Sequence, residues 1–191
     1  SRGLGDVYKR QALETDLIDF TEELRAEALE TYAQHTAGPL YTPPALGGNI
    51  IRPGWSGGAN WWGAAFDPET ARLYVPSWAH FSFVVMEPGD ASSDMTIRPR
   101  VSNLPGPQGL PLFKPPYSQL VALDMNAGSR VWGVPLGDGP RRHDALRGLD
   151  LPPLGNYEKS GGPLLTKTLL FIGQGIESKS LRVCDKDTGY E

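Results

Sequence analysis

Only one segment of the chain has the apolar spacing of an amphipathic α-helix. Residues 21–35 place Leu24, Ala28 and Tyr32 at four-residue steps, which puts these side chains on one face of a helix. Thr21 can cap the N-terminus, and the two glutamates that follow it favour the positive end of the helix dipole. The sequence therefore predicts a single helix, followed by the extended, proline-rich connector GPLYTPPALGG.

Beyond residue 47 the apolar positions come in short runs that end at turn-forming residues, a pattern typical of antiparallel strands. Three runs align when their aspartates are superposed: AFDPETARLYV from Ala65, ALDMNAGSRVW from Ala122 and VCDKDTGYE from Val183. We interpret the three runs as an internal repeat, with one copy in each of three blades.

Each repeat is predicted to contain a tight turn that its aspartate stabilises. The carboxylate can accept hydrogen bonds from the backbone N–H groups two and three residues ahead, and a residue in the left-handed conformation then closes the hairpin. Gly128 and Gly189 suit that closing position, whereas Ala71 fits it at a cost of about 1 kcal/mol. The turn aspartates are Asp67, Asp124 and Asp185.

The spacing of the aspartates predicts long insertions between the repeats. They are 57 and 61 residues apart (124 − 67 and 185 − 124), which exceeds the roughly 40–50 residues of a minimal four-stranded blade. Residues 87–116 and 137–162 are rich in proline, glycine and charge. We expect both segments to be loops, and loops of this length usually carry function.

Composition narrows the class of protein. Glycine (23) and proline (18) make up about a fifth of the chain, too much for a helical bundle, while 39% apolar residues indicate a folded core. The net charge of −4 gives no basic face for nucleic acid or anionic lipid. A single cysteine, Cys184, excludes an internal disulfide and a cysteine-built zinc site, and we expect it to be buried and inert.

The two ends of the chain differ from the expected pattern in different ways. Residues 1–11, SRGLGDVYKRQ, differ in character from the rest of the chain and are interpreted as a non-native leader. No run of eighteen apolar residues occurs in the sequence. The third repeat stops two residues before its last position, so we expect a chain truncated at both ends.

The second repeat, Ala-x-Asp-x-x-x-Gly-x-x-x-Trp from Ala122 to Trp132, resembles the tryptophan-docking motif of quinoprotein dehydrogenases. Two further stretches are similar to the C-terminal part of glucose and alcohol dehydrogenases that depend on pyrroloquinoline quinone (PQQ). They are LYTPPALGGNIIRPGWSGGANWWGAAFDPETARLYVPS, residues 40–77, and SGGPLLTKTLLFIG, residues 160–173.

This resemblance implies an all-β fold, a partial eight-bladed β-propeller of about three blades with one N-terminal helix. The expected domains are the leader (1–11), the helix and connector (12–38), and an incomplete propeller (39–191). Trp132 is then a structural residue that docks one blade against the next. The implied function is the oxidation of an alcohol or aldose sugar, with electrons passed to a quinone or cytochrome acceptor.

The resemblance also explains the glycine-rich segment GWSGGANWWG. In the family, a flat quinone lies on the propeller axis among loops where glycine permits close approach of the backbone. Asn60 matches an asparagine whose amide binds the quinone oxygens, and its alternative role is to stabilise a turn. The expected cofactor-binding residues are Asn60, Trp61, Trp55, Gly161, Gly162 and Lys159.

Several of these assignments have structural alternatives. Trp61 and Trp62 are adjacent, so on a strand their side chains point to opposite faces and one belongs to the core. Lys159 could pair with a quinone carboxylate or be solvated. Ser160 stands where alcohol-oxidising relatives have a tryptophan, which removes one cofactor contact.

The resemblance places the catalytic base and the calcium ligands outside this chain, so no catalytic or metal-binding residue is assigned here. The expected cofactors are PQQ and calcium, the expected partner is the remainder of the propeller, and the expected location is the periplasm. Two other functions remain open. One is a non-enzymatic propeller scaffold of the bacterial envelope, and the other is a carbohydrate-binding module that uses the tryptophans as a platform.

Overall fold

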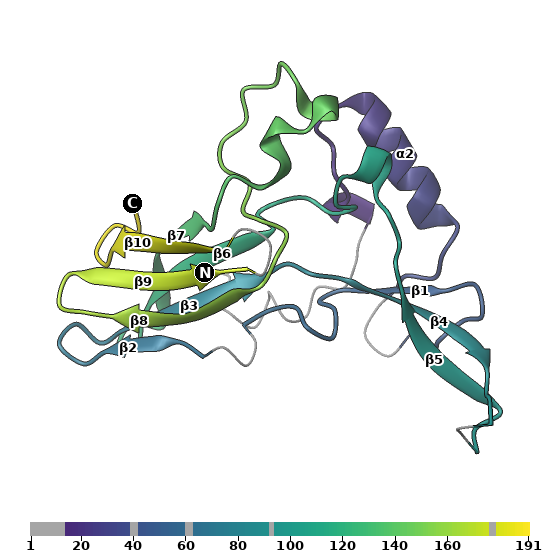
Figure 1. The fold of residues 1–191 in the computed structure, drawn as a ribbon, viewed down its shortest axis with the longest axis horizontal. Coiled ribbons are helices and arrows are strands. Elements are labelled where there is room, and N and C mark those ends of the chain that lie inside the picture. The colour runs from purple at the N-terminus through teal and green to yellow at the C-terminus, as the bar shows by residue number, and fades with distance from the viewer. Residues whose placement is uncertain (1–13, 39–41, 60–62, 92–93, 176–178) are drawn as a thin grey trace. The chain divides into compact units, whose positions relative to one another are not determined.

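A computed structural model describes residues 14–38, 42–59, 63–91, 94–175 and 179–191. The chain forms two compact units, which are described separately. The first comprises residues 1–56 and 80–114, and the second comprises residues 57–79 and 115–191. Figure 1 shows the helices and strands of both units along the chain.

The first unit contains the predicted helix. Helix α2 spans Glu22–Ala33 and follows a short 3-10 turn, η1, at Glu14–Asp16. Thr21 is its N-cap, because the Thr21 hydroxyl accepts a hydrogen bond from the Leu24 amide over 3.1 Å. Leu24 and Ala28 are buried, which confirms the predicted apolar face.

The same unit holds a three-stranded antiparallel sheet with the order β1-β4-β5. The strands are β1 (Asn49–Ile51), β4 (Ser82–Pro88) and β5 (Ile97–Ser102). The prediction of a loop over residues 87–116 is therefore wrong for β5. Arg98 and Arg100 both pair with Glu87 on β4, at 3.1 and 2.5 Å, so cross-strand ion pairs accompany the backbone ladder. A 3-10 turn, η2, follows at Pro107–Gly109.

The second unit begins with a four-stranded antiparallel sheet in the order β2-β3-β6-β7. Its strands are β2 (Ala65–Asp67), β3 (Arg72–Trp78), β6 (Ser118–Asp124) and β7 (Ser129–Pro135). Arg72 on β3 pairs with Asp124 on β6, so the first two repeats lie in the same sheet. The prediction of one repeat per blade is wrong here. Strand β3, which follows the turn of the first repeat, pairs with β6, which leads into the turn of the second repeat.

A three-stranded sheet, β10-β9-β8, completes this unit. The strands are β8 (Ser160–Leu165), β9 (Leu169–Gln174) and β10 (Ser180–Asp185). The segment before β8 contains two 3-10 turns, η3 (Gly139–Arg142) and η4 (Asp144–Leu146), within the region predicted as a loop. Strand β8 lies against β2 and β3, so the two sheets of this unit stack face to face (Figure 1).

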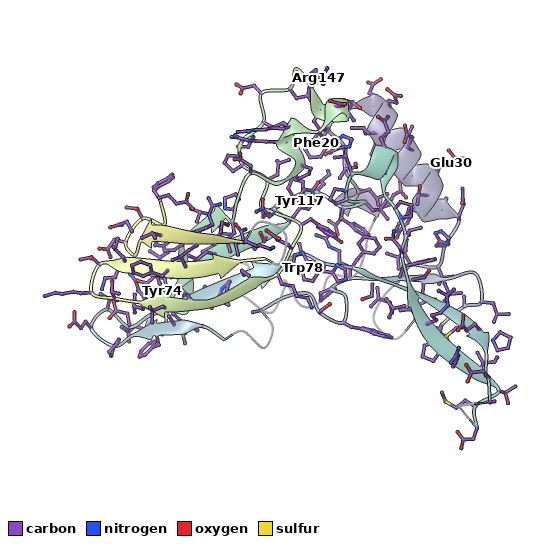
Figure 2. All side chains as sticks on the ribbon, viewed as in Figure 1. Phe20, Glu30, Tyr74, Trp78, Tyr117 and Arg147 are labelled. Carbon is purple, nitrogen blue, oxygen red and sulfur yellow. The ribbon has the colours of Figure 1, made fainter. Side chains whose placement is uncertain are left out.

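One apolar core holds the two stacked sheets together. Tyr74 and Leu120 are fully buried on the four-stranded sheet, and Leu170 and Ile172 are fully buried on the three-stranded sheet. Figure 2 shows Tyr74 on β3 within this unit. Cys184 also belongs to this core with 2% of its surface exposed, which confirms its predicted burial.

Trp132 contacts residues of both sheets, and its predicted role in docking one blade against the next stays a prediction. Its ring lies 5.8 Å from the Tyr74 ring, and its indole N–H donates to the Lys186 carbonyl over 3.3 Å. Because Trp132 is on β7 and Lys186 follows β10, this hydrogen bond connects the two sheets.

The turns at Asp124 and Asp185 form with both predicted hydrogen bonds, and the turn at Asp67 forms with the Thr70 hydroxyl as its second local donor. Asp124 Oδ1 accepts from the Asn126 and Ala127 amides, and Asp185 Oδ1 accepts from the Asp187 and Thr188 amides, over 2.8–3.0 Å. Asp67 accepts from the Glu69 amide over 3.0 Å. The closing residues Ala71, Gly128 and Gly189 have φ of 53°, 62° and 77°.

The described residues contain ten strands in antiparallel sheets and one α-helix. No helix among them is long and apolar enough to cross a membrane. The stacked sheets of the second unit are the arrangement of neighbouring propeller blades, so the predicted fold class of a partial β-propeller is confirmed.

Candidate functional site

The second unit has a pocket of about 620 Å³ at one end of its stacked sheets. Trp78 ends β3 and Gln174 ends β9, while Ser160 begins β8 and Ser180 begins β10, so these four termini meet there. The aspartate turns lie at the opposite ends of these strands. The lining residues are Trp78, Tyr157, Glu158, Lys159, Ser160, Gly161, Gly173, Gln174, Gly175, Lys179 and Ser180.

Two of the predicted cofactor-binding residues line this pocket. Lys159 is exposed immediately before β8, and Gly161 is the second residue of that strand. Ser160 between them is 6% exposed and also lines the pocket. Gly162 is the next residue of β8 and is not part of the lining.

Trp78 lines the pocket although the sequence pattern did not predict it. The Lys159 ammonium lies 5.7 Å from the centroid of the Trp78 ring, and the Tyr157 ring meets Trp78 edge-on at 5.8 Å. Figure 2 shows Trp78 where β3 ends. The sequence places Trp78 two residues after Pro76, and no local pattern there marks it as a ligand-binding residue.

Trp78 also connects the pocket to the glycine-rich segment. The Gly58 amide donates to the Trp78 carbonyl over 2.8 Å, and the Trp78 amide donates to the Gly58 carbonyl over 3.1 Å. Asn60 and Trp61 follow Gly58 by two and three residues. Both lie outside the described residues, so their predicted contacts stay predictions.

Trp55 belongs to the first unit. Its side chain is 61% exposed, and its backbone amide donates to the Ser82 hydroxyl over 3.0 Å. Its predicted contact with a cofactor stays a prediction.

Within the described part of the lining, the charged side chains belong to two lysines and one glutamate. Lys159 and Lys179 line it, and Lys179 adopts a left-handed backbone conformation with φ of 44°. The Glu158 carboxylate accepts a hydrogen bond from the side-chain amide of Asn156 over 3.2 Å. Asn156 in turn accepts from the Gly139 amide over 2.9 Å, which ties this part of the lining to η3.

A buried tyrosine supports the aromatic wall of the pocket. The Tyr117 ring contacts the Tyr157 ring edge-on at 5.7 Å, and Tyr117 is 1% exposed. Burial raises the pKa of the Tyr117 phenol, and the nearby Tyr157 raises this pKa further. Tyr117 therefore stays neutral and packs behind Tyr157, which with Trp78 forms the aromatic part of the lining.

The chemistry of the pocket lining suits a flat ring that carries negative charge. Gly161 and Gly173 leave backbone uncovered by side chains, the aromatic rings offer an apolar wall, and the lysines offer positive charge. A tricyclic quinone with several carboxylates has the matching chemistry. Calcium is different, because the described residues hold no group of three or more His, Cys, Asp or Glu side chains able to bind a metal ion.

Comparison with known proteins gives a consistent result. Residues 5–191 match the PQQ family model described as the glucose/ethanol/alcohol dehydrogenase β-propeller domain. The match begins inside the segment interpreted as a leader, and that interpretation stays a prediction.

Among similar proteins is a probable quinate dehydrogenase (quinone) from Xanthomonas campestris pv. juglandis, 26% identical, with 100% of this chain and 27% of the relative covered. The quinate/shikimate dehydrogenase (quinone) of Acinetobacter baylyi is 27% identical over 80% of this chain and 21% of the relative. The glycerol dehydrogenase large subunit of Gluconobacter thailandicus is 27% identical over 78% of this chain and 24% of the relative.

The chain thus spans about a quarter of the length of these relatives. The family model covers nearly all of it, and the stacked antiparallel sheets agree with that match. The chain belongs to the PQQ family of glucose/ethanol/alcohol dehydrogenases, as part of the β-propeller domain.

Proposed function

We propose that this chain provides part of the wall of the PQQ site in a dehydrogenase that oxidises an alcohol or aldose sugar. The observation that carries the proposal is the meeting of Lys159 and Gly161 with Trp78, whose backbone is bonded to Gly58 of the glycine-rich segment. Trp78 thus links the glycine-rich segment to the start of β8, and both segments resemble PQQ enzymes. When bound, PQQ would accept two electrons and two protons from the substrate.

Each side of the pocket has a role in this proposal. Glycine positions along β8 and β9 let the flat ring approach the backbone, and the aromatic rings exclude water from the ring face. Lys159 pairs with an acidic group of the quinone. Asn60, Trp61, Trp55 and Gly162 are proposed as cofactor-binding residues on the strength of the resemblance alone.

The remaining functional expectations are proposals as well. The parent enzyme passes its electrons to a quinone or cytochrome acceptor and works in the periplasm. The names of the relatives, quinate, shikimate and glycerol dehydrogenases, support a hydroxyl-bearing substrate. The family match supports this enzyme over a non-catalytic envelope scaffold. The proposal assigns the catalytic base and any calcium ligands to residues outside this chain.

The pocket can be tested by filling it. A Cβ at Gly161 would lie 3.4 Å from the Gly173 carbonyl, an ordinary contact, so the strand accepts a side chain there. Gly161→Leu should abolish the quenching of tryptophan fluorescence by PQQ in the full 191-residue chain. Gly47→Leu is the matched control, because a Cβ at Gly47 meets no atom within 4 Å and lies in the other unit. Equal PQQ affinity of the Gly161→Leu variant and the wild-type chain would contradict the proposal.

A further inference from the structure

We propose that Trp78 is a positioning residue, which holds the Lys159 ammonium so that this pocket binds a carboxylate of the quinone. This inference rests on the proposed function. It assigns the acidic groups of the cofactor, rather than its quinone oxygens, to the wall formed by Trp78 and Lys159.

The first observation is that Trp78 is fixed on two sides. Two backbone hydrogen bonds, at 2.8 and 3.1 Å, join it to Gly58, and the edge-on contact with Tyr157 limits rotation of the indole. Tyr157 is in turn packed on the buried Tyr117. The indole is thus supported by β3, by the glycine-rich segment and by the chain that leads into β8.

The second observation is that a lysine by itself gives little directional recognition. Its ammonium is a point charge on a flexible four-carbon stem, and Lys159 is exposed. The Trp78 ring face lies 5.7 Å from the ammonium, within the range of a cation–π interaction. This contact restricts the lysine to the rim of the pocket before a ligand arrives, which lowers the entropy lost on binding.

The third observation is the charge of the lining. Among the lining residues that the structure describes, two are lysines, Lys159 and Lys179, and one is a glutamate, Glu158, which accepts a hydrogen bond from the Asn156 side-chain amide. A positive rim favours a carboxylate over an uncharged quinone oxygen. PQQ carries quinone oxygens and carboxylate oxygens, and the carboxylate oxygens therefore match this wall.

The carboxylate could belong to the quinone or to a hydroxy-acid substrate, and we assign it to the quinone. Gly161 and Gly173 present backbone without side chains next to the aromatic rings of the lining. This shape suits a planar ring and offers few donors to the several hydroxyl groups of a sugar acid.

The experiment measures dissociation constants of the full 191-residue chain for two probes. One is PQQ, and the other is 1,10-phenanthroline-5,6-dione, a flat tricyclic ortho-quinone without carboxylates. Lys159→Gln should weaken PQQ binding about tenfold and leave the neutral quinone within about twofold of wild type. Trp78→Leu should weaken PQQ binding about three- to tenfold, and Trp78→Phe, which keeps an aromatic face, should recover most of that loss.

Two controls separate positioning from folding. Lys167→Gln removes an exposed lysine from the turn between β8 and β9, at the other end of the strands, and should leave both affinities unchanged. Salt should weaken PQQ binding to the wild-type chain more steeply than binding to Lys159→Gln. A structural defect in Trp78→Leu would instead lower the affinity for PQQ and for the neutral quinone to the same extent.

The outcomes are distinct. An equal loss of affinity for both probes in Trp78→Leu, or wild-type PQQ affinity in Lys159→Gln, would overturn the positioning role while leaving the proposed function in place. Displacement of PQQ by quinate with equal loss of quinate binding in Lys159→Gln would assign the carboxylate to the substrate and overturn the inference. Failure of the folded wild-type chain to bind PQQ at all would overturn the proposed function itself.

Discussion

The Lys186 ammonium donates a hydrogen bond to Asp67 Oδ2 over 2.6 Å, and both side chains are buried. Asp67 ends β2 in the four-stranded sheet, and Lys186 follows β10 in the three-stranded sheet. The aspartate that holds one turn therefore also joins the two sheets. A buried charge that loses its partner is strongly unfavourable, so this contact makes the stacking of the sheets sensitive to substitution and to pH.

The first prediction concerns acid stability. Hydrogen bonds from Lys186, the largest cause, and from Thr70 lower the pKa of Asp67 from 3.8 to about 2. The folded state therefore binds this proton less readily than the unfolded chain. The resulting stabilisation is complete above about pH 4 and is lost as the pH falls towards 2. Urea unfolding should show that Asp67→Asn is less stable than wild type at pH 5 and loses less stability between pH 4 and 2.

Asp144→Asn is the matched control for that experiment. Asp144 pairs with Arg147, and both side chains are more than 80% exposed, so its loss should change the free energy of unfolding by at most about 0.5 kcal/mol. The same pH dependence in Asp67→Asn as in wild type would contradict the assigned role of Asp67.

The second prediction compares two glycines at equivalent places in their turns. Gly128 and Gly189 both have positive φ, so alanine at either costs about 1–2 kcal/mol in backbone strain. A Cβ at Gly128 meets no atom within 4 Å, whereas a Cβ at Gly189 would lie 2.8 Å from the Trp132 ring. Gly189→Ala should therefore be less stable than Gly128→Ala by about a further 1–3 kcal/mol in denaturant unfolding.

Removing the obstructing ring provides the control for this pair. In a Trp132→Leu background the two glycine substitutions should have similar effects, because the added methyl group at Gly189 no longer meets an indole. Equal losses in the wild-type background would argue against the close packing of Gly189 on Trp132.

The third prediction tests the core between the stacked sheets. Leu170 is fully buried on β9, so Leu170→Ala should lower the free energy of unfolding by about 2–5 kcal/mol. Leu164 on β8 is 65% exposed, and Leu164→Ala should change it by at most about 0.5 kcal/mol. Denaturant titrations of both variants measure the difference. Similar effects of the two substitutions would show that the sheets do not stack through this face.

The fourth prediction concerns the only cysteine in the sequence. Cys184 is 2% exposed, and burial is the largest cause of the raised pKa of its thiol. Because the thiolate is the reactive form, the folded chain should react slowly with a disulfide reagent at pH 8 and rapidly in denaturant. Fast, complete labelling of the native chain would contradict the burial of β10 against the core.

Predictions were reliable where they depended on residues close together in the chain. The Thr21 cap of α2 and the turns at Asp124 and Asp185 rest on hydrogen bonds between residues two to three positions apart. Lys159 and Gly161 line one pocket, and their contact with a cofactor, which rests on the resemblance to a family loop, stays a prediction.

Long-range pairing was the part that the pattern could not predict. The repeats at Asp67 and Asp124 look like successive blades, yet Arg72 pairs with Asp124 in a single sheet. Residues 97–102 look like loop because of their proline and charges, yet they pair with β4. The role of Trp78 as a lining residue depends on the end of β3 lying beside Lys159, which the pattern does not specify.

The amino-acid order alone established the turns, the helix cap, the alternation of the strands and the family, because these depend on local hydrogen bonding and on the succession of side chains. Folding in three dimensions set which strands share a sheet, how Lys186 reaches Asp67, and which residues surround the pocket. These contacts join segments up to 119 residues apart. Their free energy comes from burial and pairing across that separation, which a local pattern does not specify.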